Sequence, residues 1–101
     1  MSVLLDCRLH GGSRQFAELR ATRDWYAVRD HVEKLDGAKL TSFLCDDITE
    51  AWIDFTYMNH SFTINDQFGD YWFSVSNPEC PDHILTIVMN HWEHLLCPSP
   101  A

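Results

Sequence analysis

The side chains that could bind a metal ion gather near the C-terminus of the chain. His91, His94 and Cys97 follow one another at intervals of three residues. On a helix, neighbours three positions apart share a face but the third side chain drifts around the cylinder, so zinc would need a further ligand such as His83. Histidines near a helix C-terminus are also favoured simply as cations. We therefore predict no cofactor and no resident metal, and keep a small zinc-binding enzyme or sensor as an alternative.

The four cysteines do not form a recognisable metal or disulfide framework. They are widely spaced, with no C-x-x-C pair, at Cys7, Cys45, Cys80 and Cys97. Because the N-terminus also lacks the basic start and apolar stretch of an export signal, we predict free thiols in the cytoplasm. Cys80 precedes Pro81 at a predicted helix start, where the pKa of a thiol can fall, although a semi-buried or capping cysteine is the simpler interpretation.

Pairs of carboxylates are the other groups that could do chemistry. Asp46 and Asp47 are adjacent, and Asp54 and Asp70 belong to two strands of a predicted sheet, with one strand between them. Acid–base catalysis needs a concave site that excludes water, and a chain of this length has little bulk from which to build one. We therefore predict that the protein is not an enzyme and that these acids act through their charge.

Length and composition predict one globular domain over residues 1–101, with a loose tail at 98–101. The chain has 101 residues, of which 46% are hydrophobic and 22% charged. A chain of this size builds one modest core and has no room for a second domain. It contains no run of about 18 apolar residues, so we expect no membrane span.

Charge is distributed very unevenly along the chain. The net charge is −8, and all seven Lys and Arg residues lie within positions 1–39, together with six acids. Residues 40–101 contain nine acids and no Lys or Arg. Such a field repels nucleic acid and anionic membranes and attracts basic partners, although acidity can also serve solubility alone.

Hydrophobic periodicity predicts an α+β fold: an antiparallel β-meander sheet of three to five strands with two α-helices packed on one face. A first strand is expected at 3–9, followed by the Gly11–Gly12 breaker, while 13–21 remain unassigned. Thr22 is the expected N-cap of a helix that ends at Gly37. Further strands are expected at 40–45 and 51–58 and on both sides of a loop at 66–69. The second helix is expected to begin at 81–82 and to end before Pro98.

Matching of apolar residues across strands predicts the register of the meander. A two-residue loop at Asn59 and His60 would pair Tyr57 with Phe62. Apolar side chains at alternate positions would then face the helices. The opposite face would carry Asp54, Asn65 and Asp70 in one cross-strand row and Thr56, Thr63 and Trp72 in the next.

This open face is the predicted docking surface, because tryptophans bury a large area and carboxylates select basic partners. The predicted contact residues are Trp52, Asp54, Asp70 and Trp72, with the acids Asp46 and Asp47. The alternative is that the N-terminal segment or a second copy of the chain covers this face.

In size, acidity and lack of a catalytic motif, the chain resembles small bacterial or phage inhibitor and immunity proteins. That resemblance implies a non-enzymatic module that occludes a basic partner, such as a nuclease, a toxin or a nucleic-acid-binding complex. It predicts no direct contact with nucleic acid or membrane. The alternatives are a homo-oligomeric housekeeping domain, for instance a homodimer, and the zinc protein described above.

Overall fold

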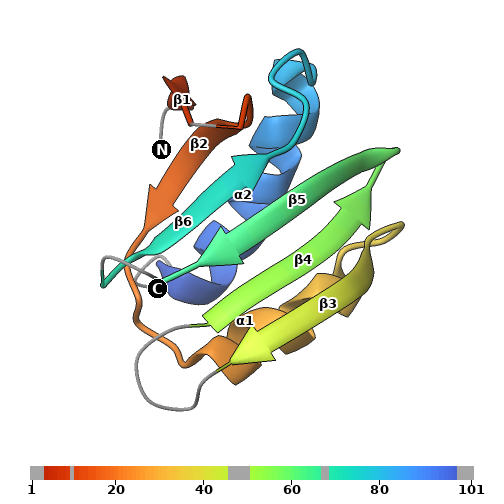
Figure 1. The fold of residues 1–101 in the computed structure, drawn as a ribbon. Coiled ribbons are helices and arrows are strands. Elements are labelled where there is room, and N and C mark those ends of the chain that lie inside the picture. The colour runs from red at the N-terminus through yellow and green to blue at the C-terminus, as the bar shows by residue number, and fades with distance from the viewer. Residues whose placement is uncertain (1–3, 10, 46–50, 67–68, 98–101) are drawn as a thin grey trace.

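The computed structural model describes residues 4–9, 11–45, 51–66 and 69–97. These residues form an α+β fold with an antiparallel sheet and two helices (Figure 1), as predicted. In chain order the elements are β1 (Cys7–Arg8), β2 (Arg14–Leu19), α1 (Trp25–Asp30), the 3-10 turn η1 (His31–Lys34), β3 (Lys39–Cys45), β4 (Ala51–Tyr57), β5 (His60–Asn65), β6 (Tyr71–Val75) and α2 (Asp82–Leu96).

The sheet has six strands in the order β1-β2-β6-β5-β4-β3, whereas three to five were predicted. The difference lies at the N-terminal edge. The expected first strand is reduced to β1, and the unassigned stretch 13–21 contains β2, which pairs with β6. β2 has a bulge at Phe16, so that Phe16 and Ala17 are both buried and the usual alternation is broken.

The hairpin between β4 and β5 turns one residue earlier than predicted. Tyr57 pairs with His60, and the loop is Met58–Asn59. Both loop residues have positive φ, 52° and 66°, which is the backbone of a type I′ turn whose twist matches the flanking strands. The predicted pairings were therefore wrong by two residues, and Phe55 faces Phe62. Because the error is even, each side chain keeps its predicted face.

Met58 is an unusual residue for its place in this turn. It has positive φ and an exposed side chain, with 58% of its surface accessible. A residue with a Cβ pays a steric cost of about 1–2 kcal/mol in this conformation, whereas glycine does not. We expect Met58→Gly to raise the free energy of unfolding by roughly 0.5–1 kcal/mol, measured by urea denaturation. Met58→Ala, which keeps the Cβ, should not stabilise the protein, and equal gains from both variants would contradict the argument.

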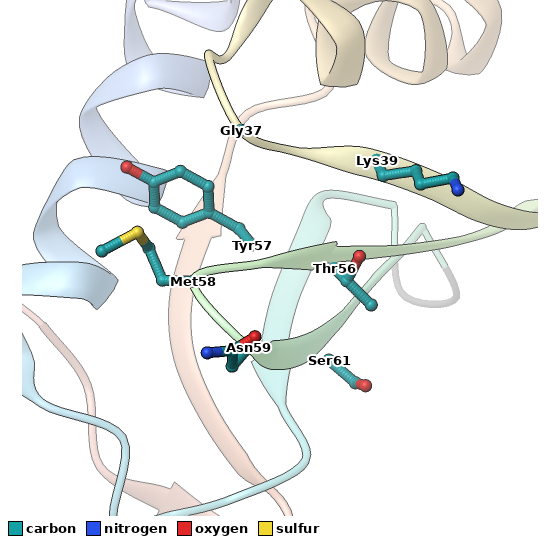
Figure 2. Close-up of a pocket in the computed structure, with 7 residues that line it drawn as sticks. All are labelled: Gly37, Lys39, Thr56, Tyr57, Met58, Asn59 and Ser61. Carbon is teal, nitrogen blue, oxygen red and sulfur yellow. The ribbon is translucent and has the colours of Figure 1, made fainter.

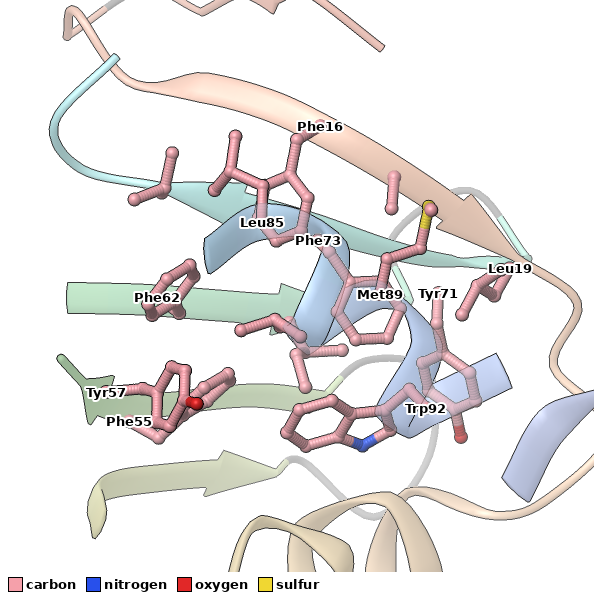
Figure 3. Packing of buried hydrophobic residues seen from close by; sticks show 14 of the residues in the cluster. Phe16, Leu19, Phe55, Tyr57, Phe62, Tyr71, Phe73, Leu85, Met89 and Trp92 are labelled. Atoms are coloured by element: carbon pink, nitrogen blue, oxygen red, sulfur yellow. The ribbon is translucent and has the colours of Figure 1, made fainter. Parts of the chain in front are cut away.

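The two helices contribute to the same buried cluster as the inner face of the sheet. In α2 the buried residues recur at helical spacing, at Ile84, Leu85, Val88, Met89, Trp92 and Leu96. Trp92 packs on Phe55 of β4 and Phe73 of β6, with ring centroids 5.0 and 5.6 Å apart (Figure 3). Its indole nitrogen donates a hydrogen bond to the Val28 carbonyl oxygen in α1. Trp92 thus ties both helices to the sheet.

The first helix is shorter than expected and has a different N-cap. Asp24, and not Thr22, caps it, because the Asp24 carboxylate accepts a hydrogen bond from the Ala27 N–H. The Thr22 hydroxyl instead donates to the Leu96 carbonyl oxygen at the end of α2. After Asp30 the chain tightens into η1, and Gly37 at φ +90° belongs to the turn that leads to β3.

Among the described residues, no helix is long and apolar enough to cross a bilayer.

Candidate functional site

The face of the sheet turned away from the buried cluster has the composition predicted for it. In β4, β5 and β6 buried residues alternate with half-buried or exposed ones, which confirms the predicted division between the two faces. Both helices lie behind the sheet in Figure 1, so the face that neither described helix covers is turned toward the viewer. We call this surface the open face, and its members on these strands are Trp52, Asp54, Thr56, Ser61, Thr63, Asn65, Trp72 and Ser74.

The true register brings the two tryptophans into one row. Trp52 pairs with Asn65, and Asn65 pairs with Trp72, so an amide lies between two indole-bearing positions on adjacent strands. At the edges Leu44 of β3 pairs with Trp52 and Glu18 of β2 pairs with Trp72. We call Trp52, Asn65 and Trp72 the tryptophan row. Matching of apolar residues across strands does not predict this row, because a register shifted by two residues leaves every side chain on the same face of the sheet.

The predicted row of Asp54, Asn65 and Asp70 does not form. Asp54 pairs with Thr63, and Asp70 precedes β6, two residues before Trp72. The two acids therefore lie on opposite sides of the tryptophan row, one beside each tryptophan along its strand. This separation excludes them as an acid–base pair acting on one atom, since such a pair must converge on the same reacting group.

Asp54 is held in a defined position. Its carboxylate accepts a hydrogen bond of 2.8 Å from the Thr63 hydroxyl, and the residue is half-buried. Glu18, beside Trp72, is exposed and adds a third negative charge to this region. Glu18 was missed by the sequence analysis, because the bulge at Phe16 hid the strand that carries it. Asp46 and Asp47 lie outside the described residues.

Positive charge lies at the borders of the open face. Lys39 pairs with Thr56, which pairs with Ser61, so an ammonium group and two hydroxyls follow one another across three strands. With the Asn59 side chain they line a shallow hollow of about 610 Å³ at the β4–β5 turn (Figure 2). At the other end of the sheet Arg20 follows Leu19, the partner of Tyr71. Between these borders lie the tryptophan row and the neighbouring row of Asp54, Thr63 and Ser74. These two rows contain the acid Asp54 and no Lys or Arg.

The residues considered for zinc do not form a metal site in the part of the chain that is described. No three His, Cys, Asp or Glu residues there are grouped so that they could hold a metal ion. His91 is engaged elsewhere, because its Nε2 atom hydrogen-bonds to the His31 carbonyl oxygen at 2.7 Å. His94 and Cys97 are exposed, and all four cysteines are free thiols.

Cys80 is buried, with 3% of its surface accessible. Burial raises the pKa of its thiol, with Asp82 acting in the same direction and Arg14 against it. The direction is opposite to the lowered pKa considered for a thiol at a helix N-terminus, and the burial of Cys80 agrees with the simpler interpretation of a buried cysteine. The thiol is unsuited to act as a nucleophile.

His31 and His91 form a reciprocal pair that joins η1 to α2. The rings stack with centroids 3.8 Å apart and planes inclined by 16°. His31 Nε2 lies 2.8 Å from the His91 carbonyl oxygen, and His91 Nε2 makes the matching bond to His31. A carbonyl oxygen only accepts, so each Nε2 must carry a proton and each neutral ring leaves Nδ1 unprotonated. Burial lowers the pKa of both imidazoles, assisted by the charges of Lys34 and His94.

Comparison of the chain with protein-family models, with curated proteins and with solved structures found no match to any of them.

Proposed function

We propose that the protein is a non-enzymatic binding module of the inhibitor or immunity type, which occludes a basic partner protein with its open face. The observation that carries this proposal is the tryptophan row on the sheet face that neither described helix covers, bordered by Asp54, Asp70 and Glu18. Tryptophans are frequent hot spots of protein interfaces, and surrounding carboxylates steer and select a positively charged partner. A basic nuclease, toxin or nucleic-acid-binding complex has the required charge.

Charge also favours a different partner over a second copy of this chain. Two copies meeting through their open faces would bring Asp54, Asp70 and Glu18 toward the same acids of the other copy, and like charges across an interface disfavour binding. The free thiols of all four cysteines suit a reducing cytoplasm, where we place the protein.

The proposal is tested by capture from native lysate at low salt, with variants matched in net charge. Asp54→Lys and Asp70→Lys each reverse a charge beside the tryptophan row, whereas Asp36→Lys makes the same change at an exposed turn after η1. We expect wild type and Asp36→Lys to retain one stoichiometric basic protein that a salt step releases. The other two variants should bind it at least about tenfold more weakly, because a repulsive pair replaces an attractive one.

Circular dichroism of each variant checks that the fold is retained, since Asp54 is half-buried and bonded to Thr63. Equal binding by all three lysine variants would overturn the proposal, because it would show that the open face does not take part. A mass measurement that gives a stable dimer, disrupted by changing Trp52 or Trp72, would instead support the homo-oligomeric alternative.

A further inference from the structure

We infer that β3 binds an extended segment of a partner protein as a further strand of the sheet, and that this segment carries apolar and basic side chains on one face. β3 is the last strand in the sheet order, and it pairs with β4 on one side (Figure 1). A strand at an edge presents N–H and C=O groups on its outer side, to which a further strand can bond. The opposite edge is β1, which has two residues and offers a much shorter row of these groups.

A groove of about 440 Å³ lies between β3 and the segment formed by α1 and η1. Its lining comes from both sides and consists of Arg29, Asp30, Glu33, Leu40 and Phe43. Leu40 and Phe43 pair with Phe55 and Ile53 of β4, whose side chains are buried, so all four belong to the inner face of the sheet. Every second side chain of a strand added beyond β3 would stand on this same face. These side chains would therefore enter the groove.

The lining of the groove selects both an apolar and a basic side chain. Leu40 and Phe43 are half-buried and pack against the core, so they offer an apolar surface. The Arg29 guanidinium lies 4.9 Å from the Phe43 ring centroid, and one of its nitrogens is 2.9 Å from the Asp30 carboxylate, so these two charges compensate each other. Glu33 is exposed and forms no salt bridge with another described residue. The groove therefore keeps one uncompensated negative charge, which a lysine or arginine of the added strand would meet.

A second copy of β3 does not supply this pattern. The side chains that β3 places on the inner face include Leu40 and Phe43 but no basic residue. Its one basic residue, Lys39, pairs with Thr56 and so belongs to the open-face side. A bulge also interrupts the register of β3 between Leu40 and Ser42, and bulges and edge lysines are features that discourage pairing between copies of a chain. The occupant that fits is thus a segment of a different protein.

Short blocked peptides test the inference without knowledge of the partner. We would titrate acetylated and amidated Lys-Thr-Ile-Thr-Lys into isotope-labelled protein and follow the backbone amide signals of Ser42, Phe43 and Leu44 by NMR. Its first, third and fifth side chains share one face of a strand, so a lysine flanks isoleucine in either strand direction. Glu-Thr-Ile-Thr-Glu reverses the charge, and Lys-Thr-Asn-Thr-Lys removes the apolar side chain. Two further peptides carry N-methyl groups, one on both threonines and the other on isoleucine and the last lysine.

We expect the lysine peptide to shift these amide signals saturably and to slow hydrogen exchange at those that point away from β4. The glutamate and asparagine peptides should bind at least about threefold more weakly, because one is repelled by Glu33 and the other buries less apolar area. Only one of the two N-methylated peptides should bind, since alternate N–H groups of a strand point toward opposite edges and one set faces β3.

A pair of matched variants tests the role of the acid. Glu33→Gln should weaken binding of the lysine peptide by about two- to threefold, the usual contribution of an exposed ion pair. Glu79→Gln makes the same change at an exposed residue before α2 and should leave binding unchanged.

Equal binding of the two N-methylated peptides would overturn strand addition, and so would the absence of a saturable shift at β3. Equal binding of the lysine peptide and either altered peptide would overturn the chemistry assigned to the groove. A dimer of the protein that slows hydrogen exchange at the same amides would assign the edge to a second copy and would also overturn the inference.

The outcome is separable from that of the proposed function, which depends on capture of a partner protein through the open face. If Asp54→Lys and Asp70→Lys weaken capture but the peptides do not add to β3, only the inference fails. If the peptides bind as expected and no partner requires Asp54 or Asp70, only the proposed function fails.

Discussion

Replacing Trp92 by alanine is expected to lower the free energy of unfolding by about 3–5 kcal/mol, the usual cost of truncating a buried aromatic residue. Trp92 has no accessible surface and touches the rings of Phe55 and Phe73 in two different strands. Its loss would leave a cavity where both helices meet the sheet. Because domains of this size are typically stable by only about 5–15 kcal/mol, the variant should lie close to the limit of folding. Urea denaturation followed by circular dichroism measures the change.

Two further variants separate the contributions of Trp92 from a general effect of altering the helix. Trp92→Phe keeps most of the packing but removes the donor that bonds to the Val28 carbonyl oxygen, so it should lose less stability than alanine. Ile87→Ala changes a residue of the same helix that is 42% exposed, and should cost little beyond about 0.5 kcal/mol. Similar losses for Trp92→Ala and Ile87→Ala would show that Trp92 is not the centre of the core.

The importance of Trp92 for the core, unlike its burial, was not visible in the sequence. In the sequence Ile84, Val88 and Trp92 recur at helical spacing, which places them on one face of the helix, and all three are buried. Periodicity says which face of an element is buried but not which residues meet across elements. The contact with Val28 joins positions 64 residues apart, and only the tertiary fold brings them together.

The register of the sheet shows why its faces could be predicted and its rows could not. Side chains alternate with a period of two, so a shift of two residues satisfies the same hydrophobic matching. What distinguishes the registers is the turn, where Met58 and Asn59 adopt positive φ. Methionine gives no sequence signal for that conformation. The composition of the candidate site was therefore predicted, while the pairing of Trp52 with Asn65 and Trp72 was not.

The strand at the N-terminal edge of the sheet was not predicted, for a different reason. Bulges place two consecutive residues on one side of a strand, so Phe16 and Ala17 break the alternation by which β2 could have been recognised. Because that strand was not predicted, the position of Glu18 beside Trp72 was not predicted either. Charge asymmetry, in contrast, needs no structure, and the basic partner predicted from it rests on the sequence alone.

Acidification is expected to destabilise the protein through the His31–His91 pair. Both imidazoles have a lowered pKa, so the unfolded chain takes up protons near pH 6.5 more readily than the folded one. The stability that the pair contributes is therefore fully present above about pH 7.5 and is lost progressively as the pH falls from about 6.5 toward the lower pKa of the folded state. Charging both rings would also place two cations about 4 Å apart, a repulsion of about 1–4 kcal/mol for effective dielectric constants of 80 to 20.

Protonation would add to Nδ1 and leave both Nε2–H···O=C bonds in place, so the loss comes from charge and desolvation and not from broken hydrogen bonds. Protonation of histidines also reduces the size of the net charge of −8, and the weaker self-repulsion acts in the opposite direction. A variant that lacks both histidines is therefore needed to separate the contribution of the pair from the effect of net charge.

We expect the urea midpoint of wild type to fall between pH 7.5 and pH 5.5 by more than that of the double variant His31→Gln with His91→Gln. His83→Gln removes an exposed histidine of the same helix and should keep the wild-type dependence. If the double variant loses as much stability in acid as wild type does, the stacked pair is not the group that titrates. If it loses less, the stacked pair that joins η1 to α2 accounts for the difference in stability in acid.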